Sequence, residues 1–512
     1  MKSRQVALNI AANFLSVAVS LFVSFFLTPY IVESIGKEAY AFVPLSNNFV
    51  QYMSIFTVSM SAMTSRFVTI KLHQNDVDSA SKYYSAAFYT NILLAVISTI
   101  ICVFLVIYID RLIDVPGNIL TDVRYLFIFI FIGFILGVST NVFSVASFST
   151  NRLDVNSAIN ISGTITRVLV IIVCFSLASP RVSFIGLSVM LTLLVQDILH
   201  FISAIKLIPQ VKIKWHYFRW DYAKEIFISG FWNSFSQLSS VLLTGLDLLI
   251  ANVMLGASAA GILAVAKTAP LALQVLINVV PTAFNPHLTI LFAKESREAF
   301  LSELLYTLKI TAVLTGIPIA GFIALAPAFF RLWVPSVAGS ELNLLAILTM
   351  GQMIAGFGLM PLFYVFTITN KLKWASFSVF ITGSLNLLLV LVLLKTTDLG
   401  LFAIAGVSSV LEVLRYLVFV PMYASHCLNT KPSTVYPSII KSLVYMALLI
   451  ASFLVLHRFL PSSSWLTLGA SAMAMAVFGL GIGFVFMLNS SERHRIRTFK
   501  PFARFFKKKE VE

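Results

Sequence analysis

The sequence predicts an all-α integral membrane protein of about 14 transmembrane helices, built as two parallel six-helix lobes plus two C-terminal helices. Its 512 residues are 59% hydrophobic and 11% charged, whereas a soluble domain has about 25% charged residues. Fourteen runs are about 20 residues or longer, which is enough to cross a bilayer. The first six of these runs recur further along the chain at an offset of 220 residues.

The predicted spans follow one another with short connections. Their limits are 6–31, 39–63, 84–109, 122–147, 157–178, 182–207, 226–253, 258–290, 303–327, 340–365, 374–395, 401–425, 437–458 and 464–488. The expected organisation is therefore an N-terminal lobe (1–207), a linker (208–225), a C-terminal lobe (226–425), two extra helices (437–488) and a basic tail (489–512).

The distribution of Lys and Arg predicts the orientation of the spans. With both termini in the cytoplasm, 25 of the 36 basic residues lie in inside segments or at the adjoining span ends, and seven lie in outside loops. This bias follows the positive-inside rule and is consistent with an even number of spans. The net charge of +15 thus reports topology, and we expect no nucleic-acid partner.

The internal repeat rests on spacing more than on identity. Spans seven to twelve start within about three residues of the positions expected by adding 220. Gly36 corresponds to Gly256, and Thr150-Asn151-Arg152-Leu153 corresponds to Thr369-Asn370-Lys371-Leu372. Because each copy holds an even number of spans, both copies should share one orientation in the membrane.

Several classes of protein are disfavoured by what the sequence lacks. No loop is long enough to form a separate domain, and no phosphate-binding glycine loop is present, so ATP hydrolysis is not expected from this chain. The first apolar run exceeds a signal-peptide core and is expected to be retained. Cys102, Cys174 and Cys427 lie in apolar runs without a pairing pattern, which predicts neither a disulfide nor a metal site. No cofactor is expected.

A polar stripe runs along one face of the first span and returns in the seventh. The stripe residues are Asn9, Asn13, Ser16, Ser20 and Ser24, then Ser229, Asn233, Ser236, Ser240 and Thr244. Their spacing places each set on one helix face. Small polar residues can serve close helix packing, but the bulkier amides favour a cavity lining. The bulkier residues are Asn13 and Asn233 with Gln237, and the second span adds Asn47, Asn48 and Gln51.

Charged residues inside the predicted spans are further candidates, because a charge in the bilayer must be paired or must face water. Arg167 has no local partner and is the best candidate to hold an anionic group. Lys267 and Asp247 lie at similar depths on the consecutive spans eight and seven, which predicts an ion pair across the hairpin that these spans form. Glu412 and Arg415 are three residues apart and could neutralise each other or contribute to a cationic site.

Ion coupling is the possible role of the acidic residues in the spans, Asp197, Asp247 and Glu412. Asp197 shares a helix face with His200, for which a structural role is the alternative. Pro270, Pro281 and Pro286 should kink span eight and make it a moving element. The tail is expected to anchor on anionic membrane lipids.

With these features, the chain resembles the bacterial oligosaccharide-lipid flippases of the polysaccharide-transporter family, in the superfamily that includes the multidrug and toxin extrusion antiporters. The resemblance covers the whole chain. It rests on Asn13, Thr28-Pro29-Tyr30, Gly36-Lys37-Glu38-Ala39-Tyr40, Pro44-Leu45, Ser229-Gly230-Phe231-Trp232-Asn233, Asp247-Leu248-Leu249-Ile250 and Gly256.

The resemblance implies export of sugar repeat units on an undecaprenyl-pyrophosphate carrier across the bacterial cytoplasmic (inner) membrane, by alternating access. A cationic cavity would hold the pyrophosphate, with Arg167, Lys267 and Arg415 as the matching cations. The expected partners are the lipid-linked oligosaccharide, membrane lipids and polysaccharide polymerase machinery. The product could be lipopolysaccharide O-antigen, capsule or exopolysaccharide.

Two other functions are alternatives. A cation-coupled drug-type antiporter is disfavoured because the multidrug branch often has an acid in its first helix, where this chain has none. A membrane glycosyltransferase or polysaccharide polymerase is disfavoured because no outside loop clearly exceeds about 15 residues, which leaves little room for an extramembrane catalytic site. The sequence therefore predicts a transporter and not an enzyme.

Overall fold

The computed structural model describes residues 3–282, 284, 288, 291–292, 297–337, 339–369 and 371–498. Within these ranges the regular structure is helical and contains no strand, so the predicted all-α class is confirmed. Twelve helical segments in the described part of the chain are long and apolar enough to cross a membrane. The chain is thus a membrane protein.

The predicted count of about 14 spans is not confirmed, because two predicted spans are interrupted. The run 39–63 forms α2 (Lys37–Met53) and α3 (Ile55–His73), which meet at Ser54. The run 340–365 forms three short helices, α15 (Ser340–Leu348), α16 (Gly351–Gly356) and α17 (Met360–Ile368).

The second interruption is possible in a membrane because it is buried in protein. Irregular backbone in the hydrocarbon region must be shielded from lipid. Met350, Phe357 and Leu359 flank the breaks and are at most 3% exposed. The sequence supplies Gly351, Gly356 and Gly358 in the same segment, and glycine weakens a helix.

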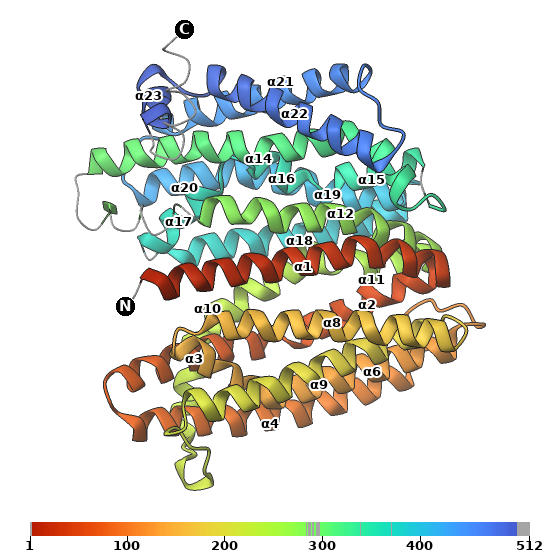
Figure 1. The fold of residues 1–512 in the computed structure, drawn as a ribbon, viewed down its shortest axis with the longest axis vertical. Helices are drawn as coiled ribbons and strands as arrows, with labels where there is room; N and C mark the ends of the chain where they lie inside the picture. Colours follow the sequence, from red (N-terminus) through yellow and green to blue (C-terminus); the bar gives the residue numbers. More distant parts are fainter. Residues whose placement is uncertain are drawn as a thin grey trace. The chain divides into compact units, whose positions relative to one another are not determined.

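The structure separates into two compact units, 1–264 and 265–512. In the first unit, α4, α6, α8 and α9 lie side by side, and α1 packs on α8 (Figure 1). Its elements are α1 (Ser3–Ile35), α2, α3, α4 (Val77–Ile107), α5 (Ile109–Leu112), α6 (Leu120–Thr140), η1 (Asn141–Ser144), α7 (Val145–Ser149), α8 (Leu153–Leu177), α9 (Val182–Leu207), η2 (Trp215–Tyr217), α10 (Trp220–Ser240), the π-helical η3 (Val241–Gly245) and α11 (Asp247–Leu255).

In the second unit, α14 packs against α21 and α22, and its core includes Phe357, Tyr445 and Phe453. The helix α12 (Ala257–Thr282) crosses the boundary between the units in the sequence. The other elements are α14 (Arg297–Trp333), α15, α16, α17, α18 (Leu372–Thr396), α19 (Leu401–Leu414), the π-helical η4 (Arg415–Phe419), α20 (Val420–Cys427), η5 (Pro432–Thr434), α21 (Tyr436–His457), α22 (Trp465–Phe486) and α23 (Ser490–Thr498).

The helix α23, at the start of the predicted tail, is fixed to the beginning of α14. Lys309 Nζ lies 2.7 Å from Glu492 Oε1, and Arg495 forms two hydrogen bonds of 2.7 and 3.0 Å with the Glu303 carboxylate. Phe499 and the rest of the predicted lipid-binding tail lie outside the described residues. The same holds for Pro286, whereas Pro270 and Pro281 lie within α12.

Two pairs of positions related by the predicted repeat offset have similar backbone conformations. Gly36 has φ 83° and ψ 158°, and its counterpart Gly256 has φ 94° and ψ 169°. Arg152 and Lys371 cap α8 and α18 with φ/ψ of −104°/55° and −112°/54°. A positive φ favours glycine, so the two glycines mark the same turn in each repeat. The lobe limits at 207 and 226 stay a prediction.

The seventh span, formed by α10, η3 and α11, packs within the first unit. Asn252 on α11 is fully buried, and its Nδ2 donates to the Asp114 carbonyl at 3.0 Å. Its Oδ1 accepts from the Asp114 N–H at 2.8 Å. The Asp114 carboxylate accepts from the Ala257 N–H at 3.2 Å at the beginning of α12. One amide therefore fixes the α5–α6 loop to α11.

Substituting Asn252→Leu is expected to destabilise the protein, because it leaves the backbone donor and acceptor of Asp114 without partners. The cost of each buried unsatisfied group is about 1–3 kcal/mol. The midpoint of thermal unfolding in detergent should fall clearly. Asn118→Leu, at an exposed position in the same loop, is the control, and equal midpoints for both variants would contradict the role of Asn252.

Candidate functional site

The polar stripe of α1 divides into parts with different surroundings. At the beginning of the helix, Asn9 is 7% exposed and is held by the connection between α7 and α8. Asn13 is exposed, and Ser16 is buried. Further along α1, the hydroxyl oxygens of Ser20 and Thr164 on α8 lie 3.4 Å apart. The stripe therefore faces α8 for much of its length.

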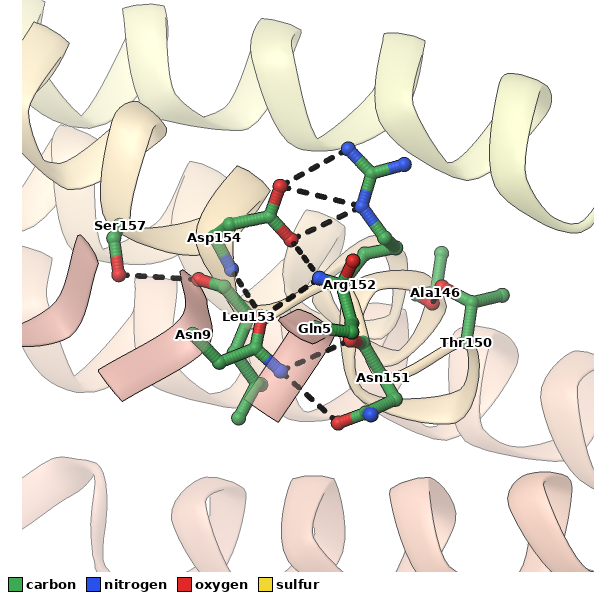
Figure 2. A network of polar contacts seen from close by, with 9 residues as sticks. All are labelled: Gln5, Asn9, Ala146, Thr150, Asn151, Arg152, Leu153, Asp154 and Ser157. Carbon is green, nitrogen blue, oxygen red and sulfur yellow. Dashed lines mark hydrogen bonds and ion pairs between the residues drawn. The ribbon is translucent and has the colours of Figure 1, made fainter. Parts of the chain in front are cut away.

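Figure 2 shows the network around Asn9, which joins α1 to the turn before α8. Asn9 Nδ2 donates to the backbone carbonyl and to Oδ1 of Asn151, at 3.0 and 3.1 Å. The Asp154 N–H donates to Asn9 Oδ1 at 3.1 Å. Gln5 adds a hydrogen bond of 2.9 Å to the Asp154 carboxylate, which also binds Arg152 at 3.0 Å.

The geometry of this turn explains why it needs asparagines. Asn151 has φ 56°, a left-handed conformation that Asn tolerates better than most residues. Its carbonyl lies beyond a helix end, where intrahelical donors are missing, and Asn9 supplies a donor. Asn9 thus has the packing role that was the alternative to lining a cavity.

A polar pocket lies inside the first unit, where the stripe reaches its second half. Its volume is about 190 Å³, and it is bounded by α1, α2, α8 and α9. The polar lining residues are Ser20, Ser24, Thr28, Tyr40, Thr164, Arg167, Thr192 and Gln196. Hydroxyl groups from α1 therefore face a guanidinium group on α8.

Arg167 gives this pocket its charge. Its Nε is buried and has no hydrogen-bond partner among the described residues. No carboxylate lines the pocket in the part of the chain that the structure describes. A charged group inside the membrane needs a counter-charge or water, so the pocket is suited to an anion. The absence of a local partner, expected from the sequence, agrees with this placement.

Packing of α9 against α8 brings Gln196 to the pocket. Thr192 Oγ1 lies 3.3 Å from the Gly163 carbonyl, and the Gln196 side chain packs against α8 at that glycine. A Cβ at Gly163 would lie 2.4 Å from Gln196 Nε2, well inside any normal contact distance. Gly163 therefore permits an amide donor at the wall of the pocket.

The predicted residues of the second span lie outside this pocket. Asn48 Nδ2 donates to the Gly245 carbonyl of the π-helical turn at 3.2 Å, and Tyr52 Oη donates to the same oxygen at 2.5 Å. Asn47 is exposed and donates to Val43 of its own helix, while Gln51 is exposed. A π-turn frees a carbonyl from the regular ladder, and Asn48 compensates for it.

In the seventh and eighth spans, Ser236, Gln237 and Lys267 are half-buried, and Asp247 is 4% exposed at the first residue of α11. The Asn233 side chain lies outside the described residues. The pairing of Asp247 with Lys267 and their functional roles stay predictions.

Glu412 and Arg415 form the ion pair that was one of the two possibilities. Arg415 Nη2 lies 2.8 Å from Glu412 Oε2, with the two side chains 8% and 2% exposed. The guanidinium carbon also lies 4.7 Å from the centre of the Tyr416 ring. The charge of Arg415 is thus compensated within the second unit, in contrast to that of Arg167.

Asp197 and His200 are half-buried on α9. Asp197 Oδ2 and His200 Nδ1 are buried atoms without a hydrogen-bond partner among the described residues. They do not line the Arg167 pocket. Their placement is compatible with ion coupling, which stays a prediction.

Comparison with known proteins identifies the family of this chain. No family model matches the chain. The chain is 30% identical over 425 residues to the uncharacterized membrane protein EpsK of Bacillus subtilis (strain 168), which covers 83% of this chain and 84% of EpsK. The chain belongs to the EpsK family of membrane proteins.

Two solved structures share the fold of this EpsK-family protein. An inward-facing multidrug resistance MATE family transporter of the MOP superfamily has a TM-score of 0.66 and 15% identity, covering 83% of this chain and 99% of its own. The lipid II flippase MurJ in an inward closed conformation has a TM-score of 0.67 and 15% identity, covering 93% and 99%. The chain therefore shares its fold with these two proteins, whereas membership of the polysaccharide-transporter family stays a prediction.

Five polar pocket residues were not among the candidate site residues of the sequence analysis: Thr28, Tyr40, Thr164, Thr192 and Gln196. A signal for three of them exists on α8 and α9. Thr164 precedes Arg167 by three residues, and Thr192 precedes Gln196 by four, so each pair shares a helix face. A search for polar faces flanking an unpaired intramembrane charge would have found them.

The burial of the Glu412–Arg415 ion pair predicts how its single and double variants affect stability. Glu412→Leu or Arg415→Leu alone should destabilise the protein by about 3–5 kcal/mol, because each leaves a buried charge uncompensated. The double variant should recover most of this loss, as measured by thermal unfolding in detergent. A double variant that loses the summed stability of both single variants would show that the pair is not self-contained.

Proposed function

We propose that this protein flips undecaprenyl-pyrophosphate-linked oligosaccharide repeat units across the bacterial cytoplasmic membrane, for the biosynthesis of a surface polysaccharide. Both termini would lie in the cytoplasm, and the protein would work by alternating access between its two repeats. The fold supports transport, since it is shared with a MATE family transporter and with the lipid II flippase MurJ.

The observation that carries the proposal is the uncompensated Arg167 in a pocket of hydroxyl and amide groups. Guanidinium groups bind phosphate oxygens through charge-assisted hydrogen bonds. The surrounding hydroxyls can donate to the same oxygens or to a sugar. A pyrophosphate group therefore finds both charge and donors here, within the span region of the protein.

Other residues have proposed roles that follow from charge. Lys267 would contribute a second cation for the substrate, whereas Arg415 would serve chiefly its pair with Glu412. Asp197 and Asp247 are the acids proposed for ion coupling, and the sugar chain would contact the exposed amides Asn13, Asn47 and Gln51. Membrane lipids and polysaccharide polymerase machinery are the proposed partners.

A cation-coupled small-molecule antiporter is the second candidate, because a multidrug transporter shares the fold. The charge of the pocket favours the flippase, since an antiporter that binds cations requires an acid where this pocket has Arg167. An enzyme is less favoured, because the fold is shared with transporters.

Deletion of the gene in its host tests the function directly. Lipid-linked oligosaccharide should accumulate, and a membrane-impermeant sugar label should reach it only after spheroplasts are lysed. Surface polysaccharide should be lost in the same strain. Unchanged lipid-linked pools and surface polysaccharide, in a strain with no second flippase, would contradict the proposal and favour the antiporter.

Arg167→Gln should lower export by about tenfold or more, since a hydrogen bond to a charged group contributes about 1.5–3 kcal/mol. Arg167→Lys should retain part of the activity, because it keeps the charge but loses the planar fork. Export is measured by complementation of the deletion strain at matched amounts of protein in the membrane.

Arg66→Gln is the matched control, because Arg66 is an exposed arginine on α3 of the same unit. It should export normally. Normal export by Arg167→Gln would remove the cationic pocket from the mechanism, while equal losses in both variants would indicate a general effect of basic residues.

A further inference from the structure

An apolar groove runs between α1 and α8 on the first unit. Its volume is about 660 Å³, and it is lined by Phe22, Val23, Phe26, Leu27 and Tyr30 of α1 with Val168 and Ile172 of α8. Phe22 and Phe26 are 66% and 57% exposed, so the groove is open at its side. A long apolar chain can therefore enter it laterally.

The groove and the Arg167 pocket share a wall. Val23 and Leu27 line both of them, and Val168, which lines the groove, directly follows Arg167 in the sequence. On α1, the polar pocket residues Ser24 and Thr28 directly follow Val23 and Leu27 in the sequence. The two cavities are thus neighbouring compartments along one pair of helices.

The two volumes differ in what they can hold. Sites for drug-sized ligands have volumes of about 300–1,000 Å³. The polar pocket, at about 190 Å³, is below this range and can enclose only a head group. The groove, at about 660 Å³, has room for a chain but offers almost no polar partner. Only a ligand that joins an anionic group to an apolar chain satisfies both.

We propose that pocket and groove form one site for the phosphate end of the carrier lipid, with its phosphate oxygens at Arg167 and its first isoprenoid units between α1 and α8. This proposal rests on the proposed flippase function and specifies which part of the substrate binds the first unit. The sugar would then extend away from the groove.

The depth of Arg167 distinguishes a transported lipid from a resident one. Arg167 lies 14 residues beyond the beginning of α8 at Leu153, which is about 21 Å along a helix. The end of α8 at Leu177 lies 10 residues further, which is about 15 Å. Because the hydrocarbon core is about 30 Å thick, Arg167 lies inside it and away from both head-group layers. A resident phospholipid keeps its phosphate in those layers, whereas a lipid in transit must carry its phosphate through this depth.

The test measures binding of three probes to the purified full-length protein in detergent by isothermal titration calorimetry. The probes are inorganic pyrophosphate, farnesyl pyrophosphate and phosphatidylglycerol. Farnesyl pyrophosphate should bind about tenfold or more tightly than inorganic pyrophosphate, because its chain buries apolar surface in the groove. Phosphatidylglycerol should compete with neither.

Two variants separate the compartments. Arg167→Gln should lower the affinity for both pyrophosphate probes by about tenfold or more. Ile172→Trp should fill the groove, so that farnesyl pyrophosphate binds no more tightly than inorganic pyrophosphate while the latter is unchanged. Ile165→Trp, at an exposed position of α8 outside the groove, is the matched control and should bind all probes as the unmodified protein does.

The proposal is overturned if farnesyl pyrophosphate binds no better than inorganic pyrophosphate, or if Ile172→Trp and Ile165→Trp behave alike. Competition by phosphatidylglycerol would also overturn it, in favour of a site for a resident lipid. Failure of the flippase function would appear separately, as normal surface polysaccharide in the deletion strain despite specific binding of farnesyl pyrophosphate.

Discussion

The free-energy cost of a charge inside a bilayer is the constraint on which this structure depends. The second unit meets that constraint internally, because Arg415 is paired with Glu412 at 2.8 Å. In the first half of α14, Lys309 is paired with Glu492 at 2.7 Å. Arg167 is different, since its pocket offers hydroxyls and an amide but no carboxylate among the described residues. A ligand that supplies negative charge would complete this arrangement.

The same constraint applies to backbone groups. At the π-turn of the seventh span, the freed Gly245 carbonyl accepts hydrogen bonds from Asn48 and Tyr52. At the turn before α8, Asn9 satisfies the carbonyl of Asn151. Thus part of the polar content of the spans serves to stabilise irregular backbone in an apolar surrounding, and it is unavailable to a substrate.

Sequence patterns predicted the features that hydropathy and period determine. They gave the helical class and most of the spans. The predicted duplication agrees with the positive φ that Gly36 and Gly256 share. They could not predict the interruptions at Ser54 and after Leu348, because a broken helix can be as apolar as a continuous one. They also could not separate Asn9, Asn48 and Ser24, since a polar side chain on a helix face has the same pattern whether it binds backbone or lines a pocket.

The sign of the charge in the pocket depends as much on α1 as on Arg167. Hydroxyl groups such as those of Ser20 and Ser24 can donate to an anion or accept from a cation, so they accept either kind of ligand. The first acidic residue of α1 is Glu33, which lies beyond the pocket. A carboxylate on the α1 wall of the pocket would supply the counter-charge for Arg167 and would make the pocket neutral. The uncharged stripe of α1 therefore keeps the pocket cationic, a polarity that suits an anionic ligand better than a cationic one.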